Sequence, residues 1–116
     1  MNLDFETRDE AEIARLPDKV VLANAASLRS ALQERIAAGS YRMVLDLSRV
    51  EFVDSSGLGA ILACVTSARR RGGDLALASP TPRVRALIEL TRLDDAVLVT
   101  DDEATAVARL LGRQAA

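Results

Sequence analysis

The segment Asp54-Ser55-Ser56-Gly57-Leu58-Gly59 holds the residues of this sequence that are best placed for chemistry or binding. Asp54 or Ser55 is a suitable N-cap for a following helix, yet two glycines fall in its first turns, where each costs roughly 1 kcal/mol relative to alanine. One interpretation is structural: the glycines let the helix pack closely on a sheet. The other is functional: a helix start without side chains lets a partner's backbone approach an exposed serine hydroxyl.

Enzymatic interpretations of this serine pair find no support in the sequence. The chain has no histidine, which excludes a Ser-His-Asp triad, a histidine phosphorelay and a histidine-rich metal site. No G-x-S-x-G elbow, phosphate-binding P-loop or dinucleotide fingerprint is present. A phospho-aspartate receiver could use Asp46 as its acceptor, but it would need a lysine after a late strand, and Lys19 is the only lysine. We therefore predict no catalytic residue, no metal and no cofactor.

The elements that must position this segment alternate between strand and helix patterns. Pro17-Asp18 interrupts the second apolar run, which Lys19-Val20-Val21-Leu22 resumes, so the end of that strand stays open. Strands are expected at 3–5, 13–16, 43–47, 75–78 and 96–99. Helices are expected from an N-cap at Asn24 to Gly39, from Asp54 or Ser55 to Gly72, after Pro82, and after Asp101 or Asp102. The order ββαβαβαβα predicts an α/β domain with a small mixed sheet of four to five strands, in which 43–47 is a central strand buried on both faces.

Composition limits the possible settings of such a domain. A chain of 116 residues predicts a single domain at 1–112 with a short C-terminal tail at 113–116. The formal charge of -2 argues against nucleic acid as a partner. The acidic N-terminus does not resemble a signal peptide, and the longest uncharged run falls short of the ~20 residues that cross a bilayer. With a lone cysteine, Cys64, expected to be a buried thiol, we predict a soluble cytoplasmic protein that does not insert into membranes.

At the serine segment the sequence resembles the STAS family, and specifically the bacterial anti-sigma factor antagonists. The stretch from Val44 to Leu62, which includes Asp46-Leu47-Ser48 and Asp54-Ser55-Ser56-Gly57-Leu58-Gly59, is similar to the family signature almost without interruption. Gly72-Gly73-Asp74-Leu75 and the helix after Pro82 follow in the order that the family shows. The resemblance implies the STAS fold over most of the chain.

The resemblance also implies a function and a site. In that family the first serine after the aspartate, here Ser55, is phosphorylated by a serine kinase that is also the anti-sigma factor, and a serine phosphatase reverses the modification. The unphosphorylated antagonist binds and sequesters this partner, and phosphorylation releases it. The implied partner-binding residues are Asn24, Asp54, Ser55, Ser56, Gly57 and Leu58. Such a protein is a substrate of enzymes rather than an enzyme.

One departure from the family pattern lies before the first helix. Relatives commonly carry a glycine and, three places later, an aspartate, where this chain has Asp18 and Val21. Val21 either fills the core at the end of the second strand or marks altered engagement of a kinase. Two other functions stay open: a STAS subunit docked permanently in a larger complex of the lipid-transport or stressosome type, and a small-ligand or enzymatic domain. The sequence leaves the oligomeric state open.

Overall fold

The chain folds into alternating strands and helices, and the computed structural model describes residues 1–112. The strands are β1 (Asp4–Arg8), β2 (Ala11–Arg15), β3 (Lys19–Val20), β4 (Arg42–Asp46), β5 (Phe52–Val53), β6 (Asp74–Ala78) and β7 (Leu98–Thr100). The helices are α1 (Leu22–Ala37), α2 (Ser55–Arg70), α3 (Pro82–Leu90) and α4 (Glu103–Leu110), with a short 3₁₀ turn, η1, at Leu93–Asp95. The tail expected at 113–116 lies outside the described residues.

Five of the strands form one mixed sheet in the order β1-β2-β4-β6-β7. β1 pairs antiparallel with β2, and the other neighbours pair in parallel. The central position of β4 confirms the prediction for 43–47: Met43 and Leu45 belong to the main core, whereas Val44 belongs to a second cluster on the opposite face. A strand buried on both faces needs apolar residues at successive positions, which explains the uninterrupted run in the sequence.

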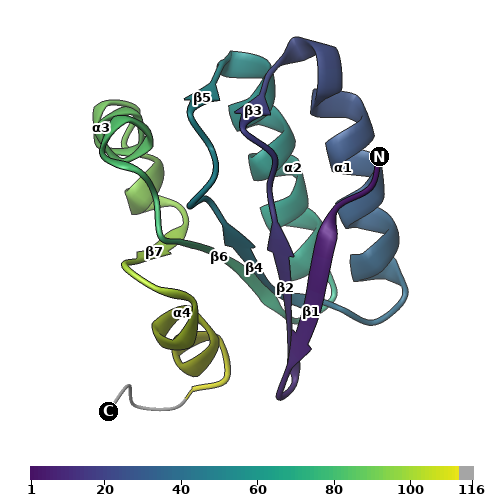
Figure 1. Ribbon diagram of the computed structural model, residues 1–116. Helices are drawn as coiled ribbons and strands as arrows, with labels where there is room; N and C mark the ends of the chain where they lie inside the picture. The colour runs from purple at the N-terminus through teal and green to yellow at the C-terminus, as the bar shows by residue number, and fades with distance from the viewer. Residues whose placement is uncertain (113–116) are drawn as a thin grey trace.

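The helices cover the two faces of the sheet unequally (Figure 1). α1 and α2 lie side by side on one face, where residues such as Leu28, Leu32 and Ile61 fill the main core. α4 covers the opposite face with Ala106 and Val107. The predicted α/β architecture, with four helices and a small mixed sheet, is confirmed. Among residues 1–112 no helix combines the length and the apolar character that crossing a membrane requires.

A second, two-stranded sheet was missing from the sequence prediction. β3 and β5 pair in parallel, with Lys19 opposite Phe52 and Val20 opposite Val53. The sequence left open whether the run that resumes at Lys19 continues the second strand; the structure ends β2 at Arg15 and makes Lys19–Val20 a separate strand. No pattern indicated β5, because two residues are too few to produce a periodic signal. Because β3 leads into α1 and β5 leads into α2, this small sheet sets the two helix starts beside each other (Figure 1).

Several element boundaries differ from those expected: β1 runs over Asp4–Arg8 rather than 3–5, and β2 over Ala11–Arg15 rather than 13–16. The N-cap of α1 is Val21, not Asn24, which lies three residues inside the helix. The last strand is Leu98–Thr100 rather than 96–99, because the chain first completes η1 with Leu93 buried. Of the two candidates for each remaining cap, Asp54 caps α2 and Asp102 caps α4.

Candidate functional site

Ser55 is the first residue of α2, and its side chain is exposed. The preceding Asp54 has extended backbone angles, and its Oδ1 accepts a hydrogen bond from the N–H of Gly57 at 2.9 Å. This is the cap geometry that the Asp54-Ser55 sequence predicted, and it confirms the predicted position of Ser55 at the helix start. The hydroxyl therefore stands at the positive end of the helix dipole, where a negative charge is well tolerated.

The Asp54 carboxylate also joins α2 to α1. Its second oxygen, Oδ2, accepts a hydrogen bond from the N–H of Leu22, the first residue of α1, at 2.9 Å. The N–H groups of Gly57 and Leu22 hold the pKa of the Asp54 carboxyl below its ordinary value of 3.8. One carboxylate thus serves the starts of two helices, and it reaches a backbone N–H that lies 32 residues before it in the sequence.

Asn24 stabilises the turn between β3 and α1 from inside the helix. Its Oδ1 accepts the N–H of Val21 at 2.9 Å, and its Nδ2 donates to the carbonyl oxygen of Lys19 at 2.7 Å. Both groups of the amide therefore bond to the backbone, and Asn24 is half-buried. Asn24 therefore holds the loop beside Ser55 in place, although the sequence analysis had predicted it as the N-cap of α1.

The two glycines of the segment have different surroundings. A Cβ on Gly57 would collide with the backbone carbonyl of Val20, so this glycine lets α2 start directly against β3. A Cβ on Gly59 would meet no atom within 4 Å, and this residue is exposed. The structural interpretation therefore holds for Gly57, whereas Gly59 leaves open space beside the serine as the functional interpretation requires.

The other two predicted contact residues are less exposed than Ser55. Ser56 is half-buried and borders a hollow of about 330 Å³ between α1 and α2, together with Ala26, Arg29 and Gly59. Leu58 is half-buried against the main core, which leaves only part of its side chain for a partner. The predicted residues thus share one corner of the molecule, with Ser55 as its most exposed serine.

Three exposed apolar residues near this corner were not predicted. Leu22 is 75% exposed, Phe52 is 50% exposed and Leu90 is 81% exposed. Phe52 and Leu90 border an apolar groove of about 330 Å³ between β5 and α3, with Val53 and Leu87 among its other lining residues. Phe52 belongs to the short β3–β5 sheet, which the sequence did not predict, whereas Leu22 lies at the start of α1 and Leu90 at the end of α3.

The described part of the chain has neither a metal-binding cluster nor a reactive thiol that would form a second centre. Residues 1–112 contain no group of three histidine, cysteine, aspartate or glutamate side chains that could hold a metal ion. Cys64 is fully buried, as predicted, and burial raises the pKa of its thiol to about 11. The exposed serine corner is therefore the candidate site.

Comparison with known proteins shows which family and which solved structures this chain resembles. The STAS domain family model matches residues 2–106. BtrV of Bordetella bronchiseptica, provisionally assigned as an anti-sigma factor antagonist, is 34% identical over 91 residues, which are 78% of each chain. A Thermotoga maritima crystal structure with the same provisional assignment has 29% identity and a TM-score of 0.86, over 94% of each chain. The anti-sigma factor antagonist SpoIIAA in its unphosphorylated form has 22% identity and a TM-score of 0.79, over 98% of this chain and all of that one.

Proposed function

This chain belongs to the STAS domain family, and we propose that it is an anti-sigma factor antagonist whose binding to an anti-sigma factor is switched by phosphorylation of Ser55. The observation that carries the proposal is the exposed Ser55 hydroxyl, held at the capped start of α2 within the family's signature sequence. On this proposal residues 1–112 act as one STAS domain that works in the cytoplasm as a binding module and not as an enzyme.

The partner surface is the corner built by the starts of α1 and α2. Asn24, Asp54 and Gly57 fix its backbone through the contacts described above, whereas Ser55, Ser56 and part of Leu58 face the partner. The exposed side chains of Leu22, Phe52 and Leu90 supply the apolar area that a stable complex needs around such a polar centre. We place the anti-sigma factor on this surface when Ser55 is unmodified.

Phosphorylation acts on binding and leaves the fold in place. A phosphate adds about -1.5 to -2 charges, and a helix N-terminus with unpaired N–H groups accommodates them. The Asp54 carboxylate already lies beside the modified residue, so the corner becomes strongly negative. Bulk, hydration and repulsion from acidic groups of the partner then weaken the complex. A phosphorylated form of SpoIIAA, whose fold this chain shares with a TM-score of 0.70, offers a precedent for a phosphorylated member of this fold.

The enzymes that operate the switch are part of the proposal. The anti-sigma factor is itself the serine kinase that modifies Ser55, and a serine phosphatase removes the phosphate. Val21 stands where relatives commonly carry an aspartate, so phosphotransfer to this chain is expected to be slow. A protein that docks permanently in a larger complex would instead keep the same partners whether or not Ser55 is modified.

The test measures binding of a purified anti-sigma factor of the serine-kinase type from the same organism. Ser55→Asp should weaken binding by about 100-fold or more, since a charge placed in a desolvated interface typically costs several kcal/mol. Its melting temperature should stay close to that of the wild type, and Ser55→Ala should bind like the wild type. Thr66→Asp, an exposed position on the same helix, is the matched control and should leave binding unchanged.

Two further results complete the test. Leu90→Asp should weaken binding without lowering the melting temperature, because Leu90 is 81% exposed. Peptide mapping by mass spectrometry of protein from the native cells should find phosphate on Ser55. Equal binding by the wild type and Ser55→Asp, or phosphate only at other residues, would contradict the proposal and favour a permanently docked subunit.

A further inference from the structure

The outer edge of β1 has features that distinguish it from a protected edge strand. β1 lies at one end of the five-stranded sheet, and within residues 1–112 it pairs only with β2. The pairing is unbroken over five positions, from Asp4 opposite Arg15 to Arg8 opposite Ala11. Natural sheets usually protect such an edge with charged side chains, proline, a bulge or a very short strand. β1 has no proline and no bulge, and its charged residues Asp4, Glu6 and Arg8 include both signs, so a partner strand of matching charge order can still pair with it. A regular edge of this kind is a template for another strand.

The register shows which backbone groups point outward from this edge. Arg8 and Ala11 flank the two-residue turn Asp9-Glu10, so they must exchange both of their backbone hydrogen bonds. Because this pattern alternates along an antiparallel pair, the N–H and C=O groups of Phe5 and Thr7 face away from β2. A second antiparallel strand with Phe5 opposite its Thr7, and Thr7 opposite its Phe5, would bond all four groups.

The side chains of β1 are self-complementary in that same arrangement. Asp4 and Arg8 lie two places on either side of Glu6, on the face that α4 covers, where Arg8 bonds Glu103. Two copies of β1 that pair antiparallel around Glu6 place each Asp4 opposite the other copy's Arg8. The present contacts of Asp4 are long, at 3.6 Å to Arg15 and 3.9 Å to Arg49, so its carboxylate can take a nearer cation.

This arrangement places Glu6 of one copy opposite Glu6 of the other, but the two carboxylates do not prevent the strands from pairing. Glu6 accepts hydrogen bonds from Arg15 Nη2 at 2.6 Å and from Arg8 Nε at 3.0 Å within its own chain. Two guanidinium groups therefore neutralise each carboxylate before the strands meet. We propose that this chain forms a two-fold homodimer through the outer edge of β1, with β1 of each copy paired to β1 of the other in one continuous sheet.

The region beside β1 has room for the second copy. A two-fold axis perpendicular to the sheet keeps both α1 helices on the same face, next to the dimer seam. There, a hollow of about 420 Å³ lies between Leu3 and Phe5 on one side and Ala31 and Ala38 on the other. A second hollow of about 400 Å³ continues along α1 past Ala26 and Ser30. A five-residue strand alone buries less than the ~1,600 Å² of a standard interface, so contact between the α1 helices must supply the remaining area.

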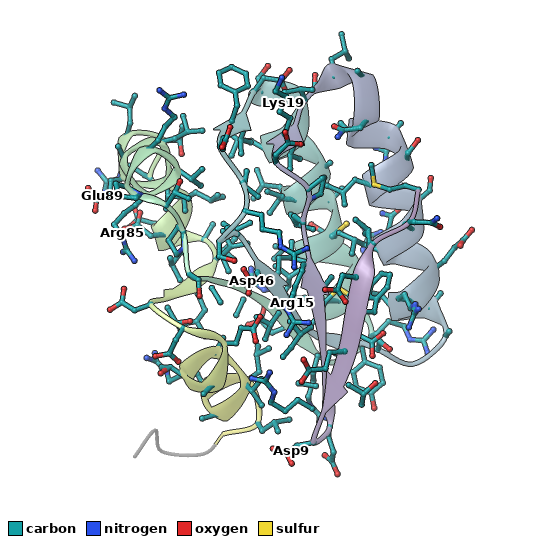
Figure 2. The ribbon with its side chains drawn as sticks, in the orientation of Figure 1. Asp9, Arg15, Lys19, Asp46, Arg85 and Glu89 are labelled. Atoms are coloured by element: carbon teal, nitrogen blue, oxygen red, sulfur yellow. The ribbon has the colours of Figure 1, made fainter. Side chains whose placement is uncertain are left out.

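The dimer leaves the serine corner accessible. Lys19, beside the serine corner, and Asp9, in the β1–β2 turn, lie at opposite ends of the molecule (Figure 2). β1 contributes none of the partner-binding residues of the proposed function, so each dimer presents two copies of Ser55. The hollows of the two surfaces share only Ala26, and the two proposals can fail separately.

The decisive experiment exchanges charges between the two copies. Sedimentation of the wild type from about 1 µM to about 1 mM should show a monomer–dimer equilibrium. In an Asp4→Arg dimer, the arginine at position 4 of each copy faces Arg8 of the other, and in an Arg8→Asp dimer the aspartate at position 8 faces Asp4. Both arrangements contain two like-charged pairs. Each variant should therefore dimerise about tenfold or more weakly than the wild type. An equimolar mixture of the two variants restores an opposite-charge pair at both positions and should recover the dimer as a heterodimer, detected by native mass spectrometry.

Controls separate this mechanism from general effects of charge or folding. Asp94→Arg and Arg70→Asp make the same charge changes at exposed positions on η1 and α2 and should leave dimerisation unchanged. Hydrogen exchange of the Thr7 amide should slow as the wild-type concentration rises. The proposal is overturned by a wild type that stays monomeric at the highest concentration, or by a mixture that dimerises no better than either variant alone.

Discussion

At the scale of single residues, Asp54 determines the geometry of the serine corner. Its carboxylate accepts N–H groups from the starts of both α1 and α2, whereas Asp102 makes the corresponding contact to Thr105 at the start of α4 alone. The pKa of each carboxyl is lowered, in both cases chiefly by a backbone N–H of its own helix. These two caps form a matched pair for measuring what the second helix adds.

We expect Asp54→Ala to destabilise the protein more than Asp102→Ala does at neutral pH. A carboxyl whose pKa is lower in the folded than in the unfolded chain stabilises the fold above its unfolded value, near 3.8, and this contribution is lost as the pH falls through the folded-state pKa. The difference between wild type and Asp54→Ala should therefore shrink below about pH 4. Urea unfolding of the three proteins from pH 7 to pH 3 measures this, and a difference independent of pH would contradict it.

Val21 occupies the N-cap of α1 with a half-buried side chain that has no hydrogen-bonding group. An aspartate at this position would cap the helix, a gain of ~1 kcal/mol, but it would stand near the Asp54 carboxylate that bonds Leu22. We expect Val21→Asp to change the free energy of unfolding by less than about 1 kcal/mol, and to gain stability with added salt as the two carboxylates are screened.

The same variant tests the proposed switch. If the missing carboxylate slows phosphotransfer, Val21→Asp should be phosphorylated on Ser55 faster than the wild type by the serine kinase that binds it. Val21→Asn, which can cap the helix without adding charge, is the control for the structural effect. Equal rates of phosphorylation in all three proteins would show that the departure at Val21 concerns packing alone.

At the scale of elements, the contact of α2 with β3 is as close as a backbone permits. Gly57→Ala should cost about 2 kcal/mol or more, because the added Cβ meets the Val20 carbonyl that also accepts the N–H of Asp54. Gly59→Ala adds the same methyl group to an open position of the same helix and should stabilise the protein by ~1 kcal/mol. Thermal unfolding of the two variants distinguishes them, and a similar loss of stability in both would contradict this account.

The sequence predicted the elements that have strong periodicity or caps, and it missed those that depend on distant contacts. The central strand with Met43, the stripe of α2 and the capping role of Asp54 follow from local patterns that the fold preserves. The pairing of Val20 with Val53 joins residues 33 positions apart and has no local signal. The position of Ser55 was predictable because it depends on the local cap of α2. The exposure of Phe52 and Leu90 was not predictable, because it depends on the β3–β5 sheet and on α3.

At the scale of the whole molecule, Cys64 reports on the integrity of the main core. Its side chain is fully buried and burial raises the pKa of the thiol to about 11, so the folded protein presents almost no reactive thiolate at pH 8. We expect a thiol reagent to modify Cys64 of the native protein only as fast as the core opens. In about 8 M urea, which unfolds most proteins, the same reagent should modify Cys64 within seconds. Labelling of the native protein as fast as in urea would show that the fold does not protect the thiol, and it would contradict this account.

The bond between Asp54 and Leu22 also has a consequence for the lifetime of the protein in a cell. The serine corner combines residues 19–24 with residues 52–57, so it exists only when both segments are folded together. A partner that binds this corner therefore recognises the native chain and not its unfolded states, and it stabilises that chain by mass action. Chains released from the partner unfold more often and are exposed to proteases for a larger fraction of the time. On the proposed function, phosphorylation of Ser55 ends the complex, and it would then also shorten the half-life of the chain.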